Sequence, residues 1–405
     1  MSFEIEKATL GDFLKFKNGK TSPERADDAS FPVFGSNGLI GRAESTNCPE
    51  KTIIIGRVGS YCGSIHFSKE RCWVSDNAIS CSSKNAGEEH FWFYVLTKLN
   101  LNQFSSGSGQ PLLNQATLNA VECQVPSSPS FRALIGGVLN DFDKKIKLNT
   151  QTNQTLEEMA QAIFKSWFVD FDPVKAKMNG EQPEGMDEAT ASLFPEKLVE
   201  SELGLIPEGW GIAKIKDFGT VVCGKTPSKA KPDFYGGSIP FIKIPDTHGK
   251  VFITETTDTL TEAGDESQPK KRIPANSICV SCIATVGKVF ITTRLSHTNQ
   301  QINAVIPNDI YSLYYMLFSF KDFNKHFHDL ASGGSATLNM NTSTFSNIDL
   351  VQPSSKILEA FHKTVNGLMQ KMLANQLENT TLAMLRDTLL PKLLSGEIEF
   401  VETTI

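Results

Sequence analysis

One stretch of the chain matches a nucleotide-binding motif letter for letter. Residues 219–226 (GTVVCGKT) satisfy the pattern GxxxxGK[ST], in which backbone N–H groups and the lysine bind phosphates between a strand and a helix. Here Pro227 and Pro232 follow at once, and a helix cannot begin there in the way that the motif requires. The interior Val-Val-Cys is typical of a strand. We therefore interpret the match as coincidental.

Other patterns that could support catalysis or metal binding are equally weak. Cys279 and Cys282 form a CxxC pair without a second pair at zinc spacing. His326 and His328 are two positions apart on a predicted helix and so do not share a face. The sequence holds neither a GxSxG nor an HExxH motif. We predict a chain without its own active site, cofactor or metal, whose eight cysteines are mostly buried free thiols.

Small polar loops remain as the candidate functional residues. Arg, Lys, Gln, Asn, Ser and Thr offer the donors and acceptors that phosphates and base edges require. Ordinary solvated loops have the same composition, so this alternative stays open. The candidates for DNA contact are Lys20, Thr21, Ser36, Asn37, Arg57, Ser60, Tyr61, Gln110, Asn114, Lys225, Thr226, Lys243, Thr285, Lys288, Ser335, Thr337 and Asn339.

These loops occur in two series because the chain is internally repeated. Gly19-Lys20-Thr21-Ser22 matches Gly224-Lys225-Thr226-Pro227, and residues 53–60 (IIIGRVGS) match residues 278–285 (ICVSCIAT). The glycine-rich segment 106–114 (SGSGQPLLN) matches 332–339 (SGGSATLN), which aligns Asn114 with Asn339. A repeat of this length predicts a duplicated domain plus helix rather than a solenoid.

A long helix must follow each copy of the domain. Leu139, Phe142, Ile146, Asn149, Asn153, Leu156, Ala160, Ile163 and Trp167 alternate at spacings of three and four, and Val365, Leu368, Met372, Asn375, Asn379, Leu382, Arg386, Leu389 and Leu393 repeat the frame. Such a seam must be covered, and its polar residues can set register against one partner. We predict that the two helices pair antiparallel, with Asn149, Asn153, Asn375 and Asn379 fixing the register. Two separate amphipathic helices are the alternative.

The resulting architecture is α+β, with two mixed α/β domains related by approximate two-fold symmetry and separated by two long antiparallel coiled-coil helices. The predicted boundaries are a first domain over 1–128, a helix over 129–168, a linker over 169–208, a second domain over 209–355, and a second helix with its tail over 356–405. A helix of about 38 residues would be about 57 Å long. Pro391, which stands where the first helix has Lys165, predicts a bend or break near the end of the second helix.

The net charge of −6 argues against strong DNA binding by charge alone. The linker accounts for that charge, with ten acidic and three basic residues, and its prolines and glycines predict an interdomain linker with short helical turns. The domains are nearly neutral, so DNA binding needs local clustering or help from a partner. The N-terminus lacks the features of a secretory signal, and no apolar run is long enough to span a membrane. We therefore expect a cytoplasmic protein.

Several phrases together resemble the specificity subunit of type I restriction-modification enzymes. They are GKTPSKAKPDFYGGSIPFIKIPD, IIIGRVGSYCGSIHFSKERCWVSDNAI, the two glycine-rich segments with their following QVPS and VQPS, ELGLIPEGW, and LLPKLLSGEIEF. The resemblance covers nearly the whole chain.

This resemblance implies a non-catalytic subunit that reads double-stranded DNA with a bipartite sequence. The two domains would be target recognition domains, each reading one half of the site, while the helices set the gap and dock two methyltransferase subunits. Two restriction/motor subunits would complete the complex. S-adenosylmethionine would bind the methyltransferase, and ATP and Mg the motor, so no cofactor would bind this chain. A scaffold that assembles protein partners without reading sequence is the alternative function.

Overall fold

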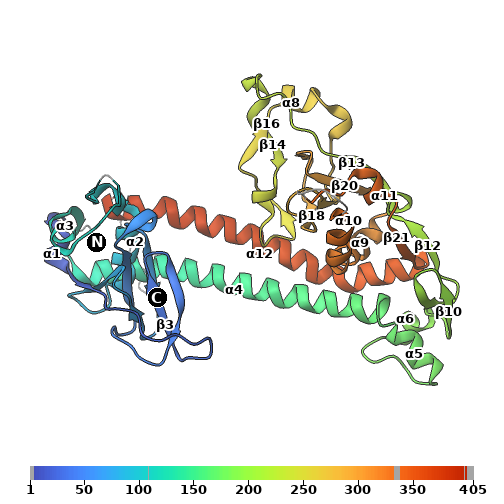
Figure 1. Cartoon of the computed structure of the whole chain (residues 1–405), viewed down its shortest axis with the longest axis horizontal. Helices are drawn as coiled ribbons and strands as arrows, with labels where there is room; N and C mark the ends of the chain where they lie inside the picture. The colour runs from blue at the N-terminus through green and yellow to red at the C-terminus, as the bar shows by residue number, and fades with distance from the viewer. Residues whose placement is uncertain (1–3, 108, 333–337, 396, 399–405) are drawn as a thin grey trace. The chain divides into compact units, whose positions relative to one another are not determined.

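The chain folds into two compact units, each described here by itself. The computed structural model describes residues 4–107, 109–332, 338–395 and 397–398. The first unit comprises residues 1–149 and 378–405, and the second comprises residues 150–377. Two long helices, α4 (Pro129–Phe168) and α12 (Ser355–Ser395), each contribute residues to both units (Figure 1).

The first unit contains three antiparallel or mixed sheets. One pairs β1 (Ile5–Thr9) with β9 (Glu122–Pro126). A four-stranded antiparallel sheet has the order β2 (Leu14–Asn18), β8 (Ala78–Ser83), β5 (Thr52–Gly56), β6 (Ile65–Ser68). A three-stranded sheet has the order β4 (Gly38–Ala43), β3 (Phe31–Gly35), β7 (Trp73–Val74), in which β3 and β7 are parallel.

The core of the first unit forms where α2 packs on β5, β6 and β8. The apolar residues of α2 (Glu89–Lys98) recur at helical spacing, and Phe91, Trp92 and Leu96 are fully buried. Leu390 and Leu393 of α12 complete this core. The remaining short helices of the unit are α1 (Leu10–Phe13), η1 (Gly59–Tyr61), η2 (Leu101–Phe104) and α3 (Gln115–Ala120).

The second unit repeats this topology and adds one strand, β15, to the larger sheet. β12 (Gly211–Lys214) pairs with β21 (Asp349–Gln352). The larger sheet has the order β13 (Gly219–Cys223), β20 (Ile302–Pro307), β17 (Ile278–Ser281), β18 (Val289–Thr292), β15 (Phe252–Ile253). The three-stranded sheet has the order β16 (Asp258–Leu260), β14 (Tyr235–Ile242), β19 (His297–Thr298), with β14 and β19 parallel.

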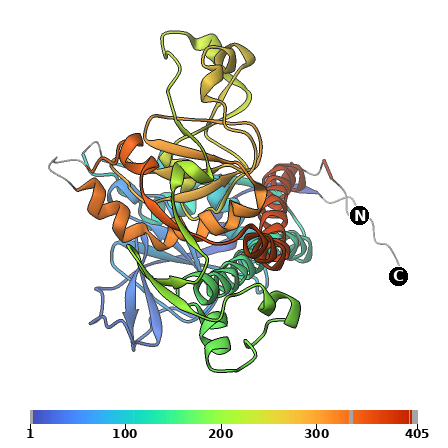
Figure 2. The ribbon, with the colours of Figure 1, turned by 90° about the vertical axis from the view of Figure 1, so that its right-hand side faces the viewer.

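A helix again covers the larger sheet of the second unit. α9 (Leu313–Asp322) packs on β17 and β18 and buries eight successive residues, 313–320. β14, β16 and α8 (Glu262–Glu266) project from the rest of this unit (Figures 1 and 2). The other short helices are α7 (Ile215–Phe218), η3 (Pro232–Phe234), η4 (Ile244–Thr247), η5 (Pro269–Lys271), η6 (Ile310–Ser312), α10 (Asn324–Ala331) and α11 (Thr342–Ser346).

The acidic segment 169–208 is more ordered than its composition predicts. It forms α5 (Asp172–Met178), α6 (Glu188–Ser192) and the hairpin of β10 (Leu198–Ser201) and β11 (Gly204–Pro207). Phe171, Val174, Phe194 and Ile206 are buried in the core of the second unit. The predicted short helical turns are present as α5 and α6, whereas the hairpin and the buried residues were not predicted. Widely spaced aromatic residues anchor this segment although its hydrophobic pattern has no sustained period.

The helix α12 does not break at Pro391. The helix continues to Ser395, although proline removes one backbone donor from the helical ladder. Leu390 and Leu393 on either side of it are 8% and 2% exposed, so burial on both sides stabilises this turn.

Within the described part of the chain, no helix is both long and apolar enough to cross a membrane.

Candidate nucleic-acid interface

A glycine and a lysine stand at the same place in both units, against the end of a short strand. In the first unit the Lys20 N–H donates to the Val74 carbonyl at 3.0 Å, and in the second the Lys225 N–H donates to the Thr298 carbonyl at 2.9 Å. A Cβ on Gly19 would lie 1.9 Å from the Ser75 carbonyl oxygen, and one on Gly224 would lie 2.1 Å from that of Asn299. Only glycine permits this close approach. Both lysine side chains are exposed.

Different side chains support the two lysine loops. The Trp73 Nε1–H donates to the Lys20 carbonyl at 3.3 Å, whereas the Gln268 Nε2–H donates to the Lys225 carbonyl at 3.0 Å. Gln268 belongs to a buried polar cluster in which its Nε2 lies 3.2 Å from Nδ1 of His297, and Nε2 of His297 lies 2.7 Å from Asp265. The same loop is thus held by one indole in the first unit and by a chain of polar groups in the second.

Asp265 is the charged centre of that cluster. Its carboxylate accepts two hydrogen bonds from Arg272 Nε and one from Nη2, between 2.6 and 3.0 Å. The Arg272 guanidinium, ahead of the contact with His297, holds the pKa of Asp265 below its ordinary value. The carboxylate is therefore ionised at neutral pH, and it fixes the imidazole that supports Gln268.

A second pair of equivalent loops follows β5 and β17. The Arg57 N–H donates to the Asn77 carbonyl at 2.9 Å, and the Cys282 N–H donates to the Gln301 carbonyl at 2.7 Å. Both loops use left-handed backbone at the same two places. Gly59 has a φ of +74° where Ala284 has +63°, and Gly63 has +85° where Gly287 has +84°.

The glycine-rich segments run against these loops and correct the alignment expected from the sequence. The Leu113 N–H donates to the Arg57 carbonyl at 2.9 Å, and the Met340 N–H donates to the Cys282 carbonyl at 2.8 Å. The next residue on each side, Asn114 or Asn341, caps a short helix through its side chain. Asn114 therefore corresponds to Asn341 rather than Asn339, because the two glycine-rich loops differ in length.

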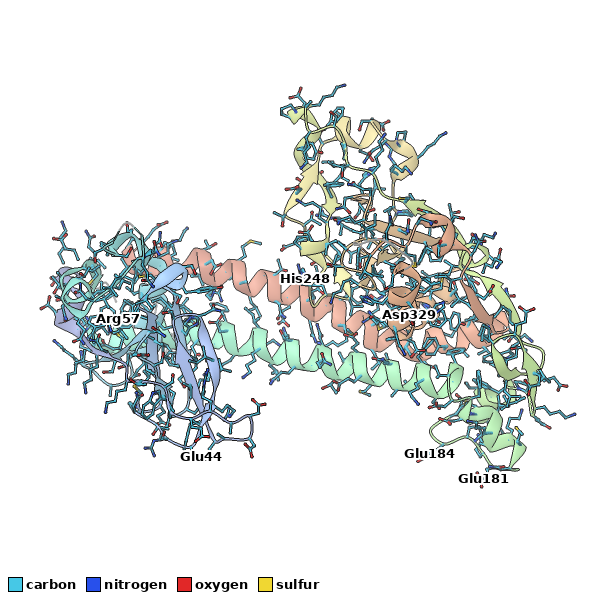
Figure 3. The ribbon with its side chains drawn as sticks, in the orientation of Figure 1. Glu44, Arg57, Glu181, Glu184, His248 and Asp329 are labelled. Atoms are coloured by element: carbon cyan, nitrogen blue, oxygen red, sulfur yellow. The ribbon has the colours of Figure 1, made fainter. Side chains whose placement is uncertain are left out.

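Near residues 74–77, the structure brings three first-unit candidates together, Lys20, Ser36 and Arg57. The Ser36 hydroxyl donates to the Asn77 carbonyl, and the Arg57 Nη1–H donates to that of Asp76 at 3.4 Å (Arg57 is labelled in Figure 3). Arg57 Nε is buried without a hydrogen-bond partner among the described residues. Lys20 lies beside them, because its N–H donates to the carbonyl of Val74, the residue before Ser75. Ser36 and Arg57 are partly exposed. The first-unit candidates that are exposed, besides Lys20, are Thr21, Asn37, Ser60, Tyr61 and Gln110.

The second-unit candidates fall into two groups. Lys225 and Lys288 are exposed, as is Asn339, and Thr226 and Thr285 are partly exposed. Lys243 instead forms an ion pair with Asp258, so its charge is partly neutralised. Asn114 of the first unit is similarly engaged, because its side-chain oxygen accepts from the Thr117 N–H at 2.8 Å. Ser335 and Thr337 lie outside the described residues.

Reasoning from the sequence missed the turns at residues 75–78 and 299–302. Both lie between the lysine loop and the loop after β5 or β17. Asp76, Asn77 and Gln300 are exposed there, and Gln301 is partly exposed. The available signal was the common frame of WVSDNA and HTNQQI, in which polar residues follow a short strand in each repeat.

The sequence also offered candidate residues for nucleotide binding and for metal binding. The residues that match the phosphate-binding pattern form the strand β13 and continue as non-helical chain to η3. Cys279 and Cys282 are buried, and burial raises the pKa of the Cys282 thiol to about 11. Across the described ranges, no three His, Cys, Asp or Glu side chains are grouped as metal ligands would be.

The register asparagines of the long helices form hydrogen bonds inside each unit. In the first unit, Asn149 Nδ2–H donates to Asn379 Oδ1 at 2.9 Å and to Glu378 at 2.7 Å. In the second, Asn375 Nδ2–H donates to Asn153 Oδ1 at 2.9 Å, and Asn153 donates to the Met372 carbonyl at 3.1 Å. Asn149 and Asn375 are 3% and 2% exposed. Residue numbers rise along α4 as they fall along α12, so the paired segments are antiparallel.

Comparison with known proteins finds one family, both by a family model and by two relatives. The family model of the type I restriction modification DNA specificity domain matches residues 4–158 and again residues 207–382. The HindI specificity subunit of Haemophilus influenzae is 44% identical over 328 residues, which cover 71% of this chain and 71% of the relative. The MjaIX specificity subunit of Methanocaldococcus jannaschii is 28% identical over 326 residues, covering 78% and 70%.

One solved structure shares the fold. The crystal structure of a type I restriction-modification S subunit from M. genitalium aligns with a TM-score of 0.65 at 16% identity, covering 98% of this chain and 97% of that one.

Proposed function

Because the chain belongs to the family of type I restriction-modification DNA specificity proteins, we propose that it is the sequence-recognition subunit of such a complex. Each unit would read one half of a bipartite target in double-stranded DNA. One observation carries this proposal: both units present the same backbone frame of lysine loop, turn and glycine-rich loop, yet with different exposed side chains. A shared frame with exchanged polar groups is what two readers of different half-sites require.

We further propose that this chain supplies recognition while its partners supply chemistry. Two methyltransferase subunits would dock on α4 and α12 and bind S-adenosylmethionine. Two restriction/motor subunits would bind ATP and Mg. The near-neutral domains support this division, since counterion release needs many phosphate contacts and partner subunits can add them. The chain would then be required for the activities of the complex without having an active site of its own.

The side chains proposed to contact DNA are the exposed ones of the shared frame together with Arg57, which is partly exposed. Lys20, Arg57 and Gln110 in the first unit and Lys225, Lys288 and Asn339 in the second have the appropriate chemistry. Lys243 and Asn114 are weaker choices, because each already has a partner within its own unit.

Methylated-base sequencing tests the proposal directly. The gene for this chain would be expressed together with that of its methyltransferase subunit in cells without other DNA methyltransferases. We expect one split sequence with a fixed gap to become methylated. The control is the methyltransferase subunit alone, which should leave DNA unmarked. An assembled complex that binds DNA without sequence preference would favour a scaffold role instead.

A further inference from the structure

Two turns, which we call the tip turns, have the same backbone in both units. In the first tip turn (residues 75–78) the Ala78 N–H donates to the Ser75 carbonyl at 2.9 Å, and in the second (residues 299–302) the Ile302 N–H donates to the Asn299 carbonyl at 3.2 Å. The residue that opens each turn is tied to the parallel strand beside it, Ser75 to Phe34 at 2.8 Å and Asn299 to Ile242 at 3.3 Å. Both are four-residue β-turns whose two central residues face solvent in whole or in part.

The backbone of each tip turn is also held from a second side. The Asn77 carbonyl accepts from the Arg57 N–H and from the Ser36 hydroxyl, and the Gln301 carbonyl accepts from the Cys282 N–H. The glycine of each lysine loop lies against the residue that opens the turn. A side chain on such a turn is presented from rigid backbone, so little ordering remains to be done when a ligand binds.

The first central residue differs between the two turns, and each choice has a definite chemistry. Asp76 is exposed, and a carboxylate accepts hydrogen bonds without donating any. Gln300 is also exposed, and its Oε1 accepts from the Thr226 hydroxyl at 2.8 Å. That hydrogen bond orients the amide and leaves its NH₂ group and one lone pair of the oxygen to face outward.

The second central residue of the second turn is used differently. Gln301 Oε1 accepts from Asn299 Nδ2 at 2.9 Å, and the Gln301 N–H donates to Asn299 Oδ1 at 3.1 Å. Its side chain therefore braces the turn instead of extending from it. This leaves Gln300 as the outward-facing group.

These groups match base edges better than they match phosphates. A carboxylate is repelled by phosphate but accepts from the exocyclic amino group of cytosine, and an amide forms a paired hydrogen bond with N6 and N7 of adenine. Lys20 and Lys225, exposed on the adjoining loops, supply positive charge that would keep the backbone of DNA nearby. An acidic residue in this position is consistent with base reading and unsuited to backbone contact.

We propose that Asp76 and Gln300 are specificity-determining residues at equivalent positions of the two units. The proposal rests on the proposed function in DNA recognition. Asp76 accepts from a cytosine in one half-site, and Gln300 pairs with an adenine in the other. Thr226 is a positioning residue, which acts through Gln300 by fixing the orientation of its amide.

Competition binding on defined duplexes tests this assignment. The chain would be purified in complex with its methyltransferase subunit. The probe would be a duplex with the bipartite sequence that becomes methylated in cells expressing the wild-type chain and this subunit. Each base pair of the two half-sites would be replaced in turn. For Gln300→Ala we expect the preference for adenine at one position of one half-site to fall about 5- to 150-fold, the range for loss of one bidentate base contact. Asp76→Asn should change the preference at one position of the other half-site from cytosine towards adenine.

Further variants separate positioning from structure. Thr226→Val should weaken discrimination at the same position as Gln300→Ala, and Thr226→Ser should restore it. Gln352→Ala and Asp27→Asn, which alter exposed residues of the second and first units, are matched controls and should leave all preferences unchanged.

Two outcomes would overturn the assignment. In one, the Asp76 and Gln300 variants keep the full wild-type preference at every position. In the other, they weaken binding evenly across all sequences, as loss of a phosphate contact does. Either result, with the wild-type complex still preferring one bipartite sequence, would refute the roles of these residues and leave the proposed function standing. A wild-type complex without any preference would refute the proposed function itself.

Discussion

At the scale of single residues, Ala284 shows that the second unit retains a strained backbone position that the first unit does not. Its φ of +63° is left-handed, whereas the equivalent position of the first unit is Gly59. A residue with a Cβ loses roughly 1–2 kcal/mol in this conformation. Sequence comparison placed these two residues together, but the dihedral angle that they share was not readable from either.

We predict opposite effects for reciprocal substitutions at this position. Ala284→Gly should raise the free energy of unfolding by up to about 1 kcal/mol, because relief of strain exceeds the added entropy of the unfolded chain. Gly59→Ala should lower it by about 1–2 kcal/mol, since a Cβ there meets nothing within 4 Å and only the backbone is affected. The urea midpoints of both variants measure this. Destabilisation by Ala284→Gly would contradict the assignment of strain.

Arg132 and Glu88 form a buried ion pair in the first unit. Their side chains are 2% and 1% exposed, with Nη2 and Oε1 3.0 Å apart. Arg132 also donates to the carbonyls of Pro126 and Ser127, and its guanidinium lies 4.8 Å from the centre of the Phe13 ring. The sequence did not single out this residue, because its partners come from three separate segments.

We predict that Arg132→Met destabilises the chain by about 3–5 kcal/mol, because it leaves the Glu88 carboxylate buried and uncompensated. Adding Glu88→Gln should recover part of the loss, since an amide can still accept from Trp92 Nε1, now 2.8 Å from Glu88 Oε2. Lys144→Met breaks an ion pair whose side chains are 59% and 71% exposed and should cost less than about 1 kcal/mol. Denaturant unfolding compares the three variants. Similar losses for Arg132→Met and Lys144→Met would contradict the prediction.

At the scale of elements, the asparagines of the long helices form hydrogen bonds between α4 and α12. The heptad spacing predicted both helices and their antiparallel pairing, because the period of apolar residues can be read from residue spacing alone. The partners of each amide were not predictable in the same way. Glu378 and the Met372 carbonyl join the network, and only the backbone path places them within reach.

A double-mutant cycle tests the Asn153–Asn375 pair. Asn153→Ala should cost about 1–3 kcal/mol, because the buried Asn375 amide loses its acceptor. The double variant Asn153→Ala/Asn375→Ala should cost less than the sum of the single changes, with a coupling of at least about 0.5 kcal/mol. Urea unfolding of the four proteins gives the coupling, and strict additivity would show that the two amides act independently.

The loops and turns proposed to contact DNA could be predicted from the sequence only in part. The repeated Gly-Lys predicted the equivalent lysine loops because a close backbone approach demands glycine. The glycine-rich loops were misaligned, since loops of unequal length leave no periodic pattern to compare. The tip turns were missed because Asp, Asn and Gln in a turn look like any solvated loop until hydrogen bonds show which side chains are engaged.

At the scale of the whole molecule, the proposed function assigns the gap of the DNA site to the helices. We predict that inserting seven residues into both α4 and α12, which preserves the heptad frame of each, leaves the bases of both half-sites unchanged and alters the number of bases between them. Methylated-base sequencing of cells that express the variant with its methyltransferase subunit would show this. A change in the bases read would contradict the separation of reading from spacing.

The order of synthesis has a consequence for the first unit, whose core includes Leu390 and Leu393 near the end of the chain. A ribosome adds about 5–20 residues each second, so the first unit waits on the order of ten seconds or more for its last helix. The second unit is continuous in sequence and can complete its core earlier. During that interval the apolar residues that contact these two leucines in the folded first unit lack them as neighbours.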